Sequence, residues 1–262
     1  MAEVDVSYDG NQSSRSWVIQ QNSYKGNQRY YKVGCDGTVA IFKSARVENG
    51  RILWIEMSNE LICHKLGKFV GAPVADVSLG DLPGKGTGLF SYWAGDKEFN
   101  PQADTLGRVV SNIDKLKDLY VFDQWTFNYN RQARHVLLDK AINGSYTLTA
   151  IDHGHTLNDY KGNKMEAHPE FRLEPSQTYF NVGFNSLSEL EEAIQRILTV
   201  PDSTVENAID HSIVEISRYA SPDDLKDVET NCKVVRQILV ERRDNIRQIM
   251  TDWCRLNGKT IS

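Results

Sequence analysis

Apolar and polar residues alternate along the first part of the chain, whereas apolar residues recur with a helical period along most of the rest. Within residues 16–44, the segments "SWVIQ", "RYYKV" and "TVAIFKS" contain aromatic and β-branched residues in near-alternation. This pattern is typical of short strands. The sequence "GCDG" at residues 34–37 separates the last two segments, and Asp-Gly favours the positive φ of a tight turn. These residues therefore predict a β-hairpin within a strand-rich region.

A helix is predicted after these strands, in "SNELICHKLGKFVG" at residues 58–71, with Ser58 as the candidate N-cap. Its apolar residues share roughly one face: Leu61, Ile62, Leu66, Phe69 and Val70. Two further strands are predicted in "APVADVSLG" and "GLFSYWAG". The glycine-rich "GDLPGKGTG" between them lacks the residue spacing of a phosphate-binding loop, so we expect a surface turn there.

The pattern is mainly helical in the second part of the chain. "NIDKLKDLYVFDQWTF" has apolar residues at helical spacing, and two short strands, "HVLLD" and "YTLTAID", flank the turn signal Asn143-Gly144. In "SLSELEEAIQRIL", Ser186 and Glu189 match a capping box. The last helix is predicted to follow Ser221, an N-cap with proline at the first helical position.

This change of pattern predicts an α+β fold with two lobes. We expect a β-rich N-lobe over residues 1–97 and a mainly helical C-lobe over residues 98–262, with the join near residues 94–104. The length of 262 residues suits one large domain or two modest ones.

Composition restricts the partners and the compartment. The net charge of −5 makes nucleic acid an unlikely partner, because no overall positive field attracts a polyanion. The four cysteines are scattered without a C-x-x-C pair, which favours a reducing compartment. The N-terminus lacks the apolar core of a signal peptide, and no apolar run reaches the length of a membrane span. We therefore expect a soluble, cytoplasmic protein without a membrane partner, and the oligomeric state stays open.

Two charged residues in the N-lobe are candidates for phosphate chemistry. Lys43 ends the apolar strand "VAIFK", and Glu60 follows in the first turn of the predicted helix. A strand lysine that is oriented by a helix acid can hold the phosphates of a nucleotide. Taken alone, two solvated surface charges are the more common explanation of such a pair.

The segment from Phe122 to Asp152 makes the phosphate interpretation specific. It contains "FDQW", then "NYNRQARH" beginning at Asn128, then "IDHG". These motifs resemble those of the HipA-like kinases, relatives of the phosphatidylinositol kinases and of the protein kinases. The family has a catalytic loop Asn-x-Asp-Arg-His-x-x-Asn after an aromatic helix and a later metal-binding Asp at a strand end. The resemblance covers nearly the whole chain and implies a protein-kinase-like fold.

The resemblance also implies roles for individual residues. Lys43 and Glu60 would bind the phosphates of ATP, Asp152 would hold Mg²⁺, and the loop residues Asn128 and Arg131 would shape the catalytic loop. The acceptor would be a Ser or Thr hydroxyl of a protein substrate.

Two of the residues with an expected role in the reaction depart from the family pattern. Asn130 stands where the family has its catalytic Asp, and an amide does not accept a proton near neutral pH. His135 stands where the family has a second metal-binding Asn, and imidazole suits Mn²⁺ and other transition metals better than Mg²⁺. A zinc cluster of His135, His153 and His155 with Asp152 is disfavoured because adjacent strand residues point to opposite faces.

Asn130 leaves several interpretations open. The chain is an ATP-dependent Ser/Thr kinase that transfers phosphate slowly by positioning alone, a kinase with an Asp-to-Asn replacement introduced on purpose, or a nucleotide-binding pseudokinase with a regulatory role. Phosphorylation of a small molecule or a lipid head group is a further alternative. The lipid version is disfavoured because the sequence lacks a basic membrane-facing cluster.

Overall fold

A five-stranded antiparallel sheet forms the N-terminal part of the computed structural model. The structure describes residues 17–25, 28–48, 51–92, 95, 97–99, 109–128, 130–157 and 184–261. The strand order is β1-β2-β3-β7-β6. The strands are β1 (Val18–Lys25), β2 (Gln28–Cys35), β3 (Thr38–Ser44), β6 (Val77–Leu82) and β7 (Gly86–Tyr92). The tight turn between β2 and β3 and the surface turn between β6 and β7 are both confirmed.

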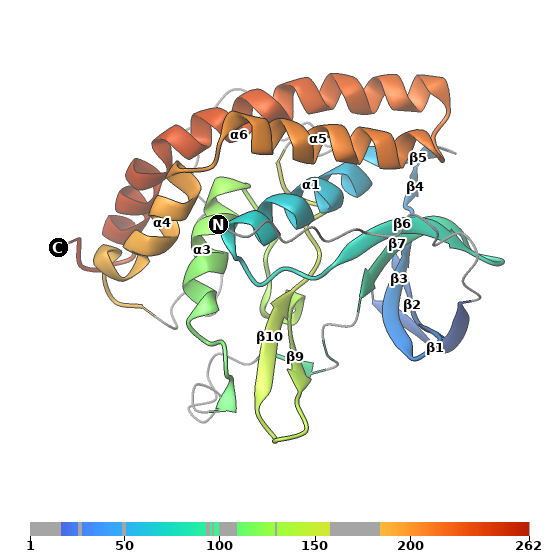
Figure 1. Ribbon diagram of the computed structural model, residues 1–262, viewed down its shortest axis with the longest axis horizontal. Coiled ribbons are helices and arrows are strands. Elements are labelled where there is room, and N and C mark those ends of the chain that lie inside the picture. The colour runs from blue at the N-terminus through green and yellow to red at the C-terminus, as the bar shows by residue number, and fades with distance from the viewer. Residues whose placement is uncertain are drawn as a thin grey trace, which may run out of the picture.

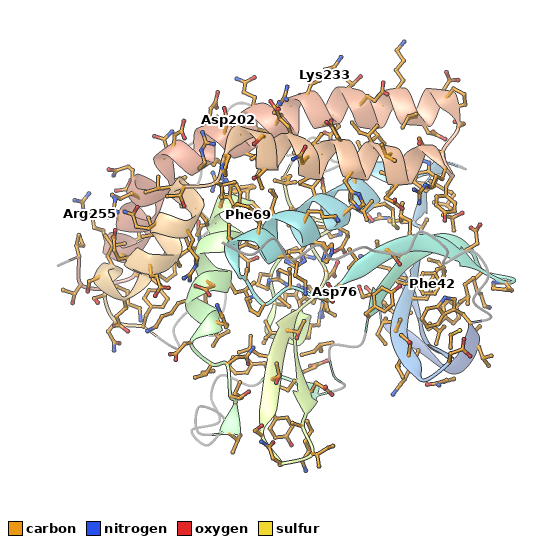
Figure 2. The ribbon with its side chains drawn as sticks, viewed as in Figure 1. Phe42, Phe69, Asp76, Asp202, Lys233 and Arg255 are labelled. Carbon is orange, nitrogen blue, oxygen red and sulfur yellow. The ribbon has the colours of Figure 1, made fainter. Side chains whose placement is uncertain are left out.

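The alternation of β3 separates an aromatic core from a charged face. Phe42 is fully buried in a small core on one face of the sheet, where its ring centroid lies 4.7 Å from that of Phe90. Figure 2 shows Phe42 within this curved sheet. Lys43 follows Phe42 directly, so it points to the opposite face. Gly88 permits β7 to lie close to this point, because a Cβ there would be 2.4 Å from the carbonyl oxygen of Lys43.

Helix α1 (Trp54–Val70) lies on the side of the sheet that carries Lys43, after the short strands β4 (Val47–Glu48) and β5 (Arg51–Ile52). The predicted N-cap at Ser58 is wrong, because the helix begins at Trp54. Ser58 is fully buried and its Oγ lies 2.9 Å from Oγ of Ser212. Glu60 consequently lies in the second helical turn. Phe69 is 55% exposed, so it does not belong to the buried face predicted for it.

The C-terminal part is mainly helical and contains a small sheet. Its helices are α3 (Lys115–Trp125), α4 (Glu191–Leu198), α5 (Asp202–Ser217) and α6 (Pro222–Leu256). The small sheet has the order β10-β9-β8, with β8 (Lys97–Glu98), β9 (Val136–Lys140) and β10 (Tyr146–Ala150). In Figure 1, α5 and α6 run side by side along one edge of the molecule, and α1 packs against α5. The fold is therefore a β-rich N-terminal sheet followed by a helical C-terminal part.

Helix starts in the C-terminal part agree with the sequence at one position and differ at another. The Ser221 hydroxyl accepts a hydrogen bond from the N–H of Asp224 at 3.2 Å, as an N-cap does. The predicted capping box at Ser186 is formed only in part, because Ser186 is the N-cap residue but its side chain caps no N–H of the helix. Its segment begins as the 3-10 helix η5 (Leu187–Leu190), and the Glu189 carboxylate accepts the N–H of Asn185 at 2.8 Å.

One apolar core joins α1 to the C-terminal helices. Trp125 at the end of α3 is completely buried, and its Nε1 donates to the carbonyl oxygen of Leu239 in α6 at 2.9 Å. Charged residues of α6 such as Lys233 and Arg255 lie on its outer side (Figure 2). Across the described ranges, the helices are too short or too polar to cross a membrane.

Candidate functional site

Lys43 brings together two acids that are far apart in the sequence. Its Nζ lies 2.9 Å from Oδ1 of Asp152 and 3.7 Å from Oε1 of Glu60. The side chains of Lys43 and Glu60 are almost fully buried, and that of Asp152 is 15% exposed. Strand β3, helix α1 and the segment after β10 each contribute one member. We call these three residues the lysine–acid cluster.

Lys43 affects the pKa values of the two acids to different extents. Burial lowers the pKa of Lys43, but Asp152 and Glu60 raise it above its usual range. Burial also raises the pKa of Asp152, but Lys43 and its other positive neighbours hold that pKa well below its usual range. The pKa of Glu60 is raised by burial, which the more distant Lys43 offsets only in part. Lys43 is therefore paired mainly with Asp152, and Glu60 is the secondary partner.

The backbone on both sides of the cluster fixes the two acids. Oε2 of Glu60 accepts the N–H of His153 at 2.9 Å, so α1 is tied to the residue that follows Asp152. Asp152 itself has a left-handed backbone with φ of 62°. Asp tolerates this conformation better than most residues. The chain changes direction at Asp152, shortly after the end of β10, and the Asp152 carboxylate points toward Lys43.

Asp152 and His135 are close enough to ligate one metal ion. Oδ2 of Asp152 lies 3.6 Å from Nε2 of His135. Nε of Arg134 donates to this Nε2 at 3.3 Å, which assigns the ring proton to Nδ1, a buried atom without an acceptor in the described part of the chain, and leaves Nε2 as the metal-binding atom. Burial lowers the pKa of His135 to about 4, which keeps the imidazole neutral at neutral pH. The oxygen and nitrogen donors fit Mn²⁺ as well as Mg²⁺.

This ligand set consists of two protein residues. Among the described residues, no three or more His, Cys, Asp or Glu side chains are grouped so that they could hold a metal ion. His153 faces elsewhere, because its Nε2 lies 2.7 Å from Nη2 of Arg131, which can only donate. Nε2 of His155 lies 3.9 Å from Oε1 of Glu56. A further ligand position would fall to phosphate oxygens or water, as is common for Mg²⁺.

Arg131 is held by an acid that the sequence had not marked as a site residue. Its Nε and Nη2 donate to the two carboxylate oxygens of Asp123 at 2.9 and 3.1 Å. Both side chains have no solvent exposure. Nδ2 of Asn128 donates to the same carboxylate at 3.1 Å. Asp123 in α3 therefore anchors both residues that were expected to shape the loop.

Arg131 also connects the loop to the lysine–acid cluster. Its Nη1 donates to the carbonyl oxygen of Ile151, which directly precedes Asp152. The N–H of Ile151 in turn donates to the carbonyl oxygen of His135 at 2.9 Å. One buried guanidinium thus fixes the loop relative to the acid that was expected to bind metal.

Asn130 lies in the turn between Asn128 and the 3-10 helix η2 (Ala133–His135). Its Oδ1 accepts a hydrogen bond from Nε2 of Gln132 at 3.3 Å, and the residue is half-buried. The amide is thus held by a neighbour of its own loop, and no contact links it directly to the lysine–acid cluster among those described.

Two further residues near the site were missed by the sequence. Tyr30 is the register partner of Lys43, so both side chains lie on one face of the sheet. Burial raises the pKa of Tyr30 to about 12, and the charges of Lys43 and Arg134 act in the opposite direction. Glu56 lies one helical turn before Glu60 and is 2% exposed. Only the strand register and the true start of α1 reveal these positions.

Comparisons with known proteins establish the fold. No protein-family model matches the chain, and no curated protein matches it in sequence. The crystal structure of CtkA, a proinflammatory kinase of Helicobacter pylori, matches with a TM-score of 0.60 and 14% identity, over 94% of this chain and 97% of that chain. This match shows that the chain has a protein-kinase-like fold, as predicted.

Two other structures match less closely. HipA from Shewanella oneidensis, in its complex with HipB and operator DNA, has a TM-score of 0.45 and 12% identity, over 95% of this chain and 70% of that chain. The MAP kinase LmaMPK10 from Leishmania major has a TM-score of 0.33 and 12% identity, over 94% of this chain and 87% of that chain.

Proposed function

We propose that this chain binds ATP together with Mg²⁺ or Mn²⁺ at the lysine–acid cluster and belongs functionally with kinases that phosphorylate a Ser or Thr of a protein. One observation carries the proposal. A buried lysine and two acids from three separate segments converge within 3.7 Å, in a fold that solved kinases share. A buried cation with surplus acid partners is costly to maintain for stability alone. Binding of nucleotide phosphates and a metal ion would explain why such a cluster is present.

Each residue of the site has a role under this proposal. Lys43 binds the phosphates, and Glu60 keeps Lys43 in position while Asp152 turns to the metal. Asp152 and His135 hold the metal, which supplies neutralisation of charge on the phosphates. Asn128 and Arg131 keep the loop in place through Asp123.

Asn130 determines how fast such an enzyme works. Phosphoryl transfer has a loose transition state and depends mainly on positioning and charge, so an amide in the position of the base still permits slow transfer. A carboxylate there contributes about 10²–10⁴-fold by general-base assistance. We therefore expect Asn130→Asp to raise phosphoryl transfer strongly and to change ATP affinity little, because Lys43 and Asp152 make the phosphate and metal contacts.

The test is transfer of label from γ-labelled ATP to the chain itself or to proteins of a cell extract. Gln132→Glu is the matched control, because it adds a carboxylate to the same loop two residues from the base position. A rise with Asn130→Asp and none with Gln132→Glu supports the assignment. Equal activity of the parent and Asn130→Asp contradicts the role given to position 130.

A pseudokinase is the second candidate, and the amide of Asn130 is the observation that favours it. Such a chain would bind ATP and act as a regulatory or interaction module. It predicts that the parent and Asn130→Asp both bind ATP and that neither transfers phosphate to any protein of the extract.

A further inference from the structure

Each of the two metal-ligand candidates is in contact with a cation of the chain itself. Nζ of Lys43 lies 2.9 Å from Oδ1 of Asp152, and Nε of Arg134 donates to Nε2 of His135 at 3.3 Å. The two ligand atoms that face each other, Oδ2 of Asp152 and Nε2 of His135, are 3.6 Å apart. Arg134 therefore uses the lone pair with which His135 would bind a metal.

Arg134 has the freedom to leave this position. It is exposed and lies in the three-residue helix η2, next to His135 in the sequence. An exposed arginine side chain reorients at little cost, in contrast to the buried Arg131. Its charge also acts on the hydroxyl of Tyr30 in β2.

A metal ion that arrives alone meets two obstacles. It must displace Arg134 from His135, and it must remain close to Lys43 and Arg134, which repel it. A polyphosphate removes both obstacles, because it offers anionic oxygens to the displaced cations. Arginine binds phosphate oxygens well through its planar array of donors.

We propose that Arg134 couples the metal to the nucleotide: it blocks His135 toward a metal ion alone and becomes a ligand of the phosphates when metal and nucleotide bind together. This inference rests on the proposed function and adds a residue to it. The consequence is that removal of Arg134 has opposite effects on two affinities. The metal alone should bind more tightly, and the metal–nucleotide complex should bind more weakly.

The experiment uses Mn²⁺ as the probe of the metal site. Binding of Mn²⁺ alone is followed by loss of the electron paramagnetic resonance signal of the free ion, for the parent, Arg134→Ala and Arg236→Ala. Arg236 is an exposed arginine of α6 and serves as the matched control. Binding of Mn²⁺–ATP is measured by calorimetry on the same proteins. We expect Arg134→Ala to tighten Mn²⁺ binding and to weaken Mn²⁺–ATP binding, each by about 5-fold or more.

Opposite changes distinguish this role from a structural one, because a damaged site weakens both affinities. The gain in Mn²⁺ affinity should disappear when His135→Ala is combined with Arg134→Ala. Equal Mn²⁺ binding by parent and Arg134→Ala, including no binding by either, overturns the inference, and so does a loss of both affinities. If the parent binds Mn²⁺ but no ATP, the proposed function fails, and tighter Mn²⁺ binding by Arg134→Ala would still support the blocking role.

Discussion

Two buried ion pairs lie close together in this molecule and differ in their number of hydrogen bonds and in their exposure to solvent. Arg131 and Asp123 form a bidentate ion pair without solvent exposure. The other N–H groups of Arg131 hydrogen-bond to Ile151 and His153. Lys43 and Asp152 form a single contact of 2.9 Å, and the Asp152 side chain is 15% exposed. One pair is complete within the protein, whereas the other keeps a carboxylate oxygen that faces His135.

The difference separates the part of the site that holds shape from the part that binds. A buried arginine whose donors are satisfied by the chain has little left to offer a ligand. A lysine with a single close partner and a second acid at 3.7 Å can change partner when a ligand arrives. We therefore expect mutations at the first pair to affect stability and mutations at the second pair to affect binding.

The largest effect is expected for Asp123→Ala. The change leaves the guanidinium of Arg131 buried without its carboxylate, and breaking a buried pair in this way costs about 3–5 kcal/mol of unfolding free energy. Asp227→Ala is the matched control, because Asp227 is exposed on α6 and should change stability by less than about 0.5 kcal/mol. Denaturant unfolding of both variants measures the difference. Similar midpoints would show that the first pair does not hold the fold.

A smaller effect is expected for Arg242→Met in α6. The Arg242 side chain is fully buried and donates to the carbonyl oxygens of Gln124 and Trp125 at the end of α3, just before the loop. Methionine leaves these carbonyls without that donor, and we expect a loss of about 1.5–3 kcal/mol, the range for hydrogen bonds to charged groups. Arg236→Met on the same helix, at an exposed position, should be nearly neutral. An equal loss in both variants would argue against this anchoring role.

The third effect concerns pH. Burial lowers the pKa of His135 to about 4, whereas an unfolded histidine titrates near 6.5. Between these values the unfolded chain binds a proton that the folded chain does not, so stability falls as the pH decreases from about 6.5 to about 4. One such group contributes at most about 1.4 kcal/mol per pH unit. Thermal unfolding of the parent and His135→Asn across this range should show a weaker pH dependence in the variant, and an unchanged slope would contradict the buried neutral imidazole.

The strands and the fold class followed from local pattern, because alternation alone places Phe42 and Lys43 on opposite faces of β3. The start of α1 did not follow. Ser58 has the chemistry of an N-cap, but its hydroxyl is used by Ser212, far away in the sequence. Local propensity does not include such a contact.

The lysine–acid cluster could be proposed from motifs, whereas its surroundings could not. Asp123 stands in the "FDQW" motif before the loop, and an acid at the end of that helix was the available signal for a partner of Arg131. Tyr30 lies in no motif, and Arg134 stands at an unspecified position of the loop motif. Their places near the site depend on the register of β2 with β3 and on the short helix η2. The split of the chain at residues 97 and 98 stays a prediction.

The most direct test of the central claim is thermal unfolding with and without Mg²⁺–ATP, for the parent, Lys43→Ala and the matched control Lys140→Ala, whose lysine is exposed on β9. A ligand that binds the folded state alone raises the melting temperature with its concentration. We predict that Mg²⁺–ATP stabilises the parent and Lys140→Ala equally and that Lys43→Ala loses most of this gain. No shift in the parent, or the same shift in all three proteins, would contradict nucleotide binding at the lysine–acid cluster.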